Sequence, residues 1–187
     1  MNFSEQKKKT LTRVDKSKKG EIDAGILDLV NLINSKDSYY TTSSCSGRII
    51  LIQKKSAKKF DCEWILVSHD QIKLEDVKKA LHEPLDAKVW FRQEPMILHV
   101  ACKTIDDAKR FLKLARQVYK RAGIISPSGR IIVELIGSEF MDTIVSKDKK
   151  LLVSDEYLKI LVDEANIKLA SNKNGIGRFY ELLKSLN

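Results

Sequence analysis

The residues best suited to bind a ligand gather in one short stretch, TTSSCSGRII, at positions 41–50. Serine and threonine hydroxyls stand there beside Gly47 and Arg48. Hydroxyls donate and accept hydrogen bonds, glycine lets a ligand approach the backbone, and the planar guanidinium of arginine matches a carboxylate or a phosphate. We interpret the stretch as an anion-binding loop. The alternative is an ordinary turn in which Arg48 pairs with a surface carboxylate.

The spacing around Cys45 argues against a covalent role for this thiol. A phosphatase-type loop separates its cysteine and arginine further, so that successive amides encircle the phosphate, whereas Arg48 follows Cys45 by three residues. We therefore interpret Cys45 as a small buried thiol. The chain has three cysteines and no CxxC pair, which disfavours a disulfide framework or a zinc site.

Three histidines are candidates for acid–base chemistry or metal binding. No two have the spacing of a metal-binding pair, so we expect no metal. His69 comes just after a predicted buried strand and beside Asp70, a carboxylate suited to orient the ring, which makes it a candidate for an active site. The alternation around His99 favours a satisfied core histidine. Glu94, before Pro95, is either a loop charge or a carboxylate presented to a site.

Helices and short apolar strands alternate along the chain and must position these residues. Helical spacing of apolar residues predicts helices over 22–35, 73–81, 105–122 and 154–186, the third beginning at a Thr104 cap. Apolar runs predict strands at 47–53, 62–68, 88–91, 95–102, 129–137, 142–146 and 151–154. The chain has no GxGxxG after a strand and no GxxxxGK[ST]. We therefore expect an α+β fold that is not of the Rossmann type.

The pentapeptide SGRII occurs twice, at 46–50 and 128–132, and each copy precedes a strand ending in Val-Ser-x-Asp. This order suggests an internally duplicated helix–strand–strand–helix unit. We expect one domain over 1–187, with halves at approximately 20–84 and 85–187 that join in a mixed sheet or barrel flanked by helices. Two related halves leave a cleft at their junction, where binding pockets often form.

The chain of 187 residues is basic, with a net charge of +9, and only 7% of its residues are aromatic. Positive charge favours a polyanionic partner, because lysine or arginine near a phosphate releases a counterion. A lysine-rich solvated surface is the alternative. The N-terminus lacks the apolar region of a signal peptide, and no apolar run approaches the roughly 20 residues of a membrane span. We expect a cytoplasmic protein with no membrane contact and no obligate protein partner.

Several segments together closely resemble the third protein family of the tRNA wybutosine pathway, the wybutosine-synthesising methyltransferases. They occur in the same order over nearly the full chain, and the Ser-Ser-Cys-x-Gly-Arg element is the most specific of them. The segments are DKSKKGEID, TTSSCSGRI, WILVSHD, EPMILHVAC, LLVSDEYLKILVDEAN and RFYELL.

The resemblance implies an S-adenosylmethionine-dependent tRNA N-methyltransferase. Its substrate would be the tricyclic wybutosine precursor 7-aminocarboxypropyl-demethylwyosine, next to the anticodon of tRNA(Phe), and the methyl acceptor its ring nitrogen N4. The implied partner is the anticodon arm of that tRNA. The alternative is a non-catalytic basic RNA-binding module, but the chain is poor in the aromatic residues on which such modules stack bases.

The resemblance also implies which residues form the site, and it raises His99 above the core role that spacing favours. The residue that accepts the proton lost from N4 is expected to be His69. Asn166 and Phe179 match the C-terminal pattern of the family. The expected catalytic residues are His69, Arg48, Glu94 and His99, the cofactor-binding residues are Ser43, Ser44, Cys45, Ser46 and Gly47, and the RNA-binding residues are Lys16, Lys18, Lys19, Lys168, Asn172 and Arg178. The sequence leaves open whether the hydroxyl-rich segment and Arg48 bind the methionine carboxylate of the cofactor or a phosphate of the tRNA.

Overall fold

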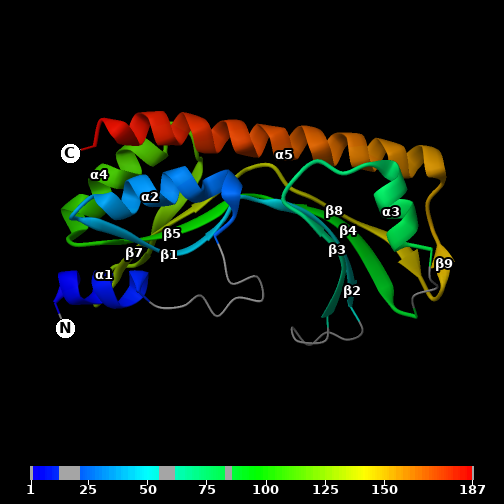
Figure 1. Ribbon diagram of the computed structural model, residues 1–187, viewed down its shortest axis with the longest axis horizontal. Helices are drawn as coiled ribbons and strands as arrows, with labels where there is room; N and C mark the ends of the chain where they lie inside the picture. The colour runs from blue at the N-terminus through cyan, green and yellow to red at the C-terminus, as the bar shows by residue number, and fades with distance from the viewer. Residues whose placement is uncertain (1, 13–21, 55–61, 83–85, 187) are drawn as a thin grey trace. The chain divides into compact units, whose positions relative to one another are not determined.

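The computed structural model describes residues 2–12, 22–54, 62–82 and 86–186, which form two compact units (Figure 1). The first unit comprises Met1–Ser46, Met96–Ser138 and Lys173–Asn187, and the second comprises Gly47–Pro95 and Glu139–Asn172. No described helix is long and apolar enough to cross a membrane.

The first unit is built around an antiparallel sheet with the strand order β1-β5-β7-β6. Helices α2 and α4 and the last part of α5 pack on one face with core side chains such as Leu98 and Phe111, and Phe3 of α1 contacts Tyr40 on the other face. The elements are α1 (Phe3–Leu11), a 3-10 turn η1 (Ala24–Ile26), α2 (Leu27–Ser35), β1 (Tyr39–Cys45), β5 (Ile97–Cys102), α4 (Ile105–Ala115), β6 (Arg121–Ser126), β7 (Ile131–Ile136) and the end of α5 (Asp155–Lys184).

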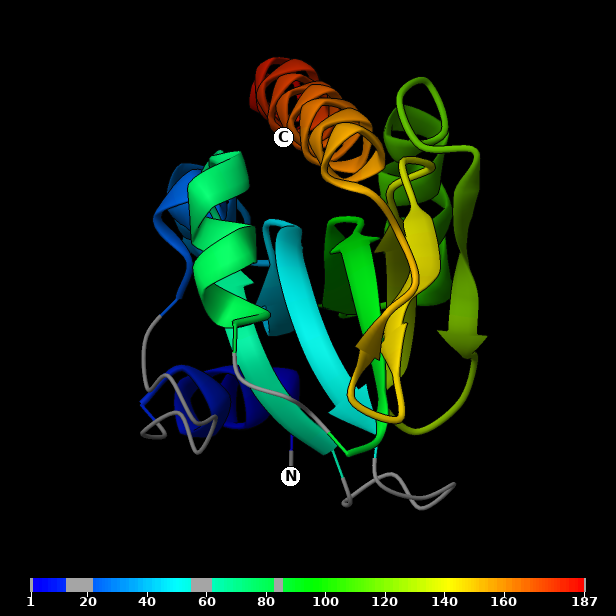
Figure 2. The same cartoon turned by 90° about the vertical axis from the view of Figure 1, so that its right-hand side faces the viewer.

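The second unit is built around an antiparallel sheet with the strand order β3-β2-β4-β8-β9. Helix α3 and the first part of α5 cover one face (Figure 2). Leu51, Phe91 and Val162 are buried together on that face. The elements are β2 (Arg48–Lys54), β3 (Cys62–Ser68), α3 (Leu74–Ala80), β4 (Lys88–Glu94), β8 (Met141–Lys147), β9 (Lys150–Leu151) and the start of α5.

The predicted C-terminal helix is confirmed, and it contributes to both cores. Helix α5 is continuous through Gly175 and Gly177. Leu161 and Leu169 are buried in the core of the second unit, whereas Phe179 is buried in the core of the first unit. One amphipathic helix of 30 residues therefore supplies apolar surface to each sheet.

The two edge strands of the first unit, β1 and β6, were not predicted from the sequence. The hydroxyl-rich stretch interpreted as a loop forms β1, because its backbone pairs with β5 from Tyr39 to Cys45 and threonine suits an extended chain. The helix predicted over 105–122 ends at Ala115, and Arg121–Ser126 forms β6. Pairing with β7 satisfies the hydrogen bonds of the backbone N–H and C=O groups in this segment. This pairing outweighs the helical pattern of its apolar residues.

The α+β class is confirmed, but the expected single mixed sheet or barrel is wrong. The described strands form two separate sheets. Within each sheet, every described pair of neighbouring strands is antiparallel. The first SGRII copy enters β2, which pairs with β3. The second copy enters β7 of the first unit, whereas the following Val-Ser strand is β8 of the second unit. The internal duplication is therefore not confirmed.

The predicted Thr104 cap of α4 is confirmed and has a pH-dependent consequence. The Thr104 hydroxyl donates to the Asp107 carboxylate at 2.6 Å and accepts from the Asp107 amide at 3.1 Å, and Arg110 forms an ion pair with the same carboxylate. Burial acts to raise the pKa of Asp107. The bonds from Thr104 and Arg110 outweigh it and hold that pKa below its ordinary value of 3.8.

We expect Asp107→Asn to lower the free energy of unfolding by about 1 kcal/mol at pH 7. Because the pKa of Asp107 is lower in the folded chain than in the unfolded chain, its contribution is complete above 3.8 and is lost as the pH falls through the folded value. Urea denaturation at pH 7 and at acid pH measures how much Asp107→Asn lowers the free energy of unfolding at each pH. Asp106→Asn, in the exposed neighbouring position, is the control, and an equal cost of Asp107→Asn at both pH values would contradict the prediction.

Candidate functional site

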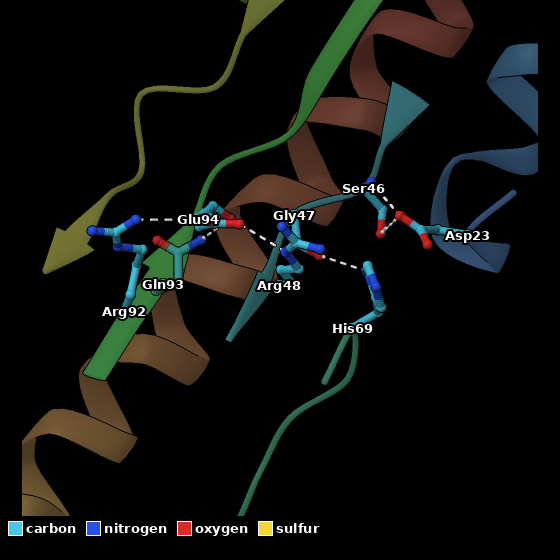
Figure 3. Close-up of polar contacts among 8 residues, drawn as sticks. All are labelled: Asp23, Ser46, Gly47, Arg48, His69, Arg92, Gln93 and Glu94. Carbon is cyan, nitrogen blue, oxygen red and sulfur yellow. Dashed lines mark hydrogen bonds and ion pairs between the residues drawn. The ribbon is translucent and has the colours of Figure 1, made fainter. Parts of the chain in front are cut away.

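Arg48 and Glu94 lie directly opposite each other on β2 and β4 of the second unit. Nε of Arg48 donates to Oε2 of Glu94 at 2.7 Å (Figure 3), and the guanidinium carbon lies 4.4 Å from the ring centroid of Trp64. Arg48 therefore has a carboxylate partner, the alternative left open by the sequence. The pair is partly buried, with 23% and 26% of the two side chains exposed, so the guanidinium is held in one orientation.

A second arginine, which the sequence pattern did not single out, extends this charged row across the sheet. Arg92 donates to Asp142 of β8 at 2.6 Å and lies 3.6 Å from Glu94. The hydrogen bond to Asp142 raises the pKa of the Arg92 guanidinium, against the effect of burial. Positive and negative groups thus alternate in the order Arg48, Glu94, Arg92, Asp142.

His69 lies just beyond β3, as predicted, and its ring is oriented by the backbone. Nδ1 is 3.1 Å from the carbonyl oxygen of Gly47 (Figure 3). Because a carbonyl oxygen only accepts, Nδ1 must carry the hydrogen, and the lone pair of the neutral ring is on Nε2. This is the tautomer in which Nε2 can act as a base.

The loop that carries His69 is braced on both sides. Ser68 donates to the carbonyl of Asp70 at 2.8 Å and accepts from the Asp70 amide at 3.1 Å. The Asn166 side chain on α5 accepts from the amide of Ile72 at 3.0 Å and donates to its carbonyl at 2.8 Å. Asn166 therefore holds the backbone of the loop that follows His69. An asparagine suits this position because its side-chain amide both donates and accepts a hydrogen bond.

Gly47, whose carbonyl holds His69, has a φ of 90°, in the region that only glycine adopts without strain. We expect Gly47→Ala to lower the free energy of unfolding by about 1–2 kcal/mol, because a side chain strains this conformation. Gly123→Ala is the control, since a Cβ at Gly123 meets no atom within 4 Å. Chemical denaturation compares the two variants. Equal small effects would show that the backbone at Gly47 carries no constraint.

Ser46, the residue before Gly47, is anchored in the first unit by a buried carboxylate. The amide of Ser46 donates to Oδ2 of Asp23 at 2.9 Å, and its hydroxyl lies 3.4 Å from the same oxygen (Figure 3). Ser43 is exposed, whereas Ser44 and Cys45 are partly exposed. Cys45 is therefore not the fully buried thiol that its spacing suggested. The free thiol that is buried is Cys102, whose pKa is raised to about 12 by burial.

His99 is also not the core histidine that its spacing favoured. It lies on the sheet face opposite Leu98, it is partly exposed, and Nε2 is 2.8 Å from Oε2 of Glu134. The register of β1, β5 and β7 places Ser43, His99 and Glu134 in one row. The structure thus brings a predicted hydroxyl residue beside a histidine–carboxylate pair, and Glu134 is the member that the sequence did not indicate.

The residues predicted to bind RNA are spread over different surroundings. Lys168 forms ion pairs with Glu164 at 3.1 Å and Glu139 at 3.5 Å. Asn172 is buried, and Arg178 is exposed. Lys16, Lys18 and Lys19 lie outside the described residues.

Comparison with known proteins gives a consistent result over the whole chain. A family model described as Methyltransferase TYW3 matches residues 5–185. The tRNA wybutosine-synthesizing protein 3 homolog of Danio rerio is 36% identical, covering 98% of this chain and 75% of that protein. The tRNA(Phe) 7-((3-amino-3-carboxypropyl)-4-demethylwyosine(37)-N(4))-methyltransferase 1 of Pyrococcus furiosus is 35% identical, covering 100% of this chain and 97% of that protein.

Solved structures agree with the sequence comparisons. A Pyrococcus horikoshii protein has a TM-score of 0.91 at 33% identity, covering 99% of this chain and 97% of that chain. A hypothetical protein from Aeropyrum pernix has a TM-score of 0.76 at 26% identity, covering 88% of this chain and 99% of that chain. The fold, the match to the family model and the full-length relatives together show that this chain belongs to the TYW3 methyltransferase family.

Proposed function

We propose that this chain is a cytoplasmic enzyme that transfers a methyl group from S-adenosylmethionine to N4 of the 4-demethylwyosine base at position 37 of tRNA(Phe). The observation that carries the proposal is the full-length relative of Pyrococcus furiosus, which is named for this reaction. Membership of a methyltransferase family supports S-adenosylmethionine as the methyl donor. A purely RNA-binding role has no support from these relatives.

The donor set of the Ser43–Arg48 segment fits the polar groups of S-adenosylmethionine. The hydroxyls of Ser43, which is exposed, and Ser44, which is partly exposed, can bond the ribose hydroxyls or the carboxylate. We assign cofactor binding to Ser43, Ser44 and Cys45. The predicted Ser46 and Gly47 are buried, and the bond between the Ser46 amide and Asp23 gives them a role in holding the segment in place. When bound, the cofactor supplies a methyl group activated on a sulfonium.

The contribution of the protein to this reaction is to position the acceptor base, exclude water and remove a proton. N4 loses its hydrogen when it gains the methyl group, so a base at that nitrogen assists the reaction. We assign this role to Nε2 of His69, because the Gly47 carbonyl fixes the hydrogen on Nδ1.

The remaining predicted site residues receive supporting roles in the proposal. Glu94 holds the guanidinium of Arg48, whose other N–H groups would bind the carboxylate of the cofactor or a phosphate of the tRNA. The His99–Glu134 pair would contact the bound substrates. We assign contacts with the anticodon arm to Lys16, Lys18, Lys19, Lys168 and Arg178. Asn172, the other residue predicted to bind RNA, is buried, so its side chain is left out of this assignment.

The thermal stability of the protein with and without S-adenosylmethionine tests the first step of the proposal. A ligand at 100 times its dissociation constant stabilises the folded state by about 2.7 kcal/mol, so the melting temperature should rise. ATP, which shares the adenosine group but lacks the methionine group, is the control. Absence of a shift with S-adenosylmethionine, together with absence of methyl transfer to tRNA, would overturn the proposal.

A further inference from the structure

One face of the second unit's sheet carries both tryptophans of the chain. Side chains alternate along a strand, so Phe91 and Leu51 face the helices, whereas Trp90 and Ile52 face the other way. The register pairs Ile52 with Trp64 of β3 on one side and with Trp90 of β4 on the other. We call this side of the sheet, opposite α3 and α5, the tryptophan face.

The tryptophan face combines a buried apolar floor with an exposed aromatic ring. Ile50 and Ile52 lie on it yet are only 1% and 7% exposed, so they form its buried part. Trp64 is 44% exposed, and Val67, in register with Ile50, is 40% exposed. The large planar ring of Trp64 is thus exposed to solvent beside buried isoleucine side chains. Exposed apolar surface of this kind is a feature of binding sites.

The two arginines on this face are each paired with a carboxylate. Arg48 pairs with Glu94, and Arg92 pairs with Asp142, so two positive groups meet two negative groups. The guanidinium of Arg48 lies over the Trp64 ring at 4.4 Å. Around Trp64 the two arginines are therefore neutralised by two carboxylates, whereas the exposed Lys88 adds positive charge at the far end of β4.

We propose that the tryptophan face binds an unpaired base of the substrate tRNA by stacking on the exposed ring of Trp64. This inference rests on the proposed function, from which the tRNA partner follows, and it identifies a surface that contacts it. Unpaired loop bases stack on aromatic rings and guanidinium planes. The Trp64 ring carries no charge and offers a base a stacking surface, while lysines elsewhere supply the charge complementarity to the RNA backbone.

The test is binding of an RNA hairpin, the anticodon stem-loop of tRNA(Phe), measured by fluorescence anisotropy at several salt concentrations. Trp64→Ala should weaken binding roughly tenfold to a hundredfold, whereas Trp64→Phe should retain most of the affinity. Tyr157→Ala is the matched control, because Tyr157 is 45% exposed on α5 of the same unit. Urea denaturation confirms that the three variants are folded.

Salt dependence separates stacking from phosphate contact. Loss of a stacked base lowers the affinity by the same factor at every salt concentration. Loss of a phosphate contact instead reduces, by about one, the salt slope, which is the slope of the logarithm of the binding constant against the logarithm of the salt concentration. A weakened Trp64→Ala variant with an unchanged slope supports the inference. A reduced salt slope in Trp64→Ala would overturn the inference. Stem-loop binding by Trp64→Ala as tight as that by Tyr157→Ala would also overturn it, and would make the tryptophan face a surface for a protein partner instead.

The inference and the proposed function fail in different ways. If the wild-type protein methylates tRNA and Trp64→Ala binds the stem-loop and methylates equally well, the inference is wrong and the function stands. If the wild-type protein binds the stem-loop through Trp64 but transfers no methyl group, the function is wrong and the inference stands.

Discussion

Replacing His69 by alanine is expected to lower the single-turnover rate of methyl transfer by about 10²–10⁴-fold, the usual contribution of a general base. The structure supplies the physical reason. The carbonyl of Gly47 fixes the hydrogen on Nδ1, so Nε2 is the nitrogen able to take a proton from the acceptor. Transfer of labelled methyl to tRNA, with enzyme in excess over tRNA, measures this rate.

Two further variants sharpen this prediction. His69→Gln can still donate a hydrogen bond to the Gly47 carbonyl but cannot accept a proton at neutral pH, so it should be as slow as His69→Ala. His82→Ala removes an exposed histidine beyond α3 and should leave the rate unchanged. Wild-type rates in both His69 variants would remove this residue from the mechanism.

Phe179→Ala is expected to lower the free energy of unfolding by about 3–5 kcal/mol, the largest effect on stability that we predict. Phe179 is 0% exposed and packs edge-on against Phe111 and Tyr119, with centroid distances of 5.5 Å and 5.7 Å. Removing the ring leaves a cavity at the point where α5 meets the core of the first unit.

Urea denaturation measures the effect of Phe179→Ala, and Glu181→Ala is its control on the same helix. Glu181 forms an exposed ion pair with Lys184, which is worth about 0.5 kcal/mol or less. If Phe179→Ala cost no more than Glu181→Ala, the ring would have a role other than packing. The resemblance noted Phe179 as a match to the C-terminal pattern of the family, and the aromatic cluster explains that match by packing.

The sequence predicted the elements with strong apolar patterns and missed those without one. Strands such as 47–53 and 62–68 are rich in isoleucine, leucine and valine, and helix α5 repeats apolar residues over its whole length. Strands β1 and β6 lie at the edges of the first unit's sheet and contain few large apolar residues. Their strand character depends on the partner strand, which no local pattern reveals.

The candidate site shows the same division between local and long-range information. His69 was predicted from its place just beyond a strand, and Arg48 from its hydroxyl-rich neighbours. That strand, β3, was expected to be buried, but it lies at the sheet edge and none of its residues is fully buried. Their partners were not predictable, because the register of β2 against β4 brings Glu94 to Arg48 across 46 residues of sequence. Asp142 and Glu134 were missed for this reason, since each meets its partner only through sheet pairing.

The most direct test of the proposed function is methyl transfer to tRNA(Phe) from cells that lack this modification step. The tRNA is incubated with the protein and S-adenosylmethionine, digested to nucleosides and analysed by mass spectrometry. We predict that the demethylated wyosine nucleoside from position 37 gains one methyl group, placed on N4 by fragmentation, and that His69→Ala abolishes the gain in the same time. An unchanged nucleoside, or a methyl group on any other nucleotide, would contradict the proposal.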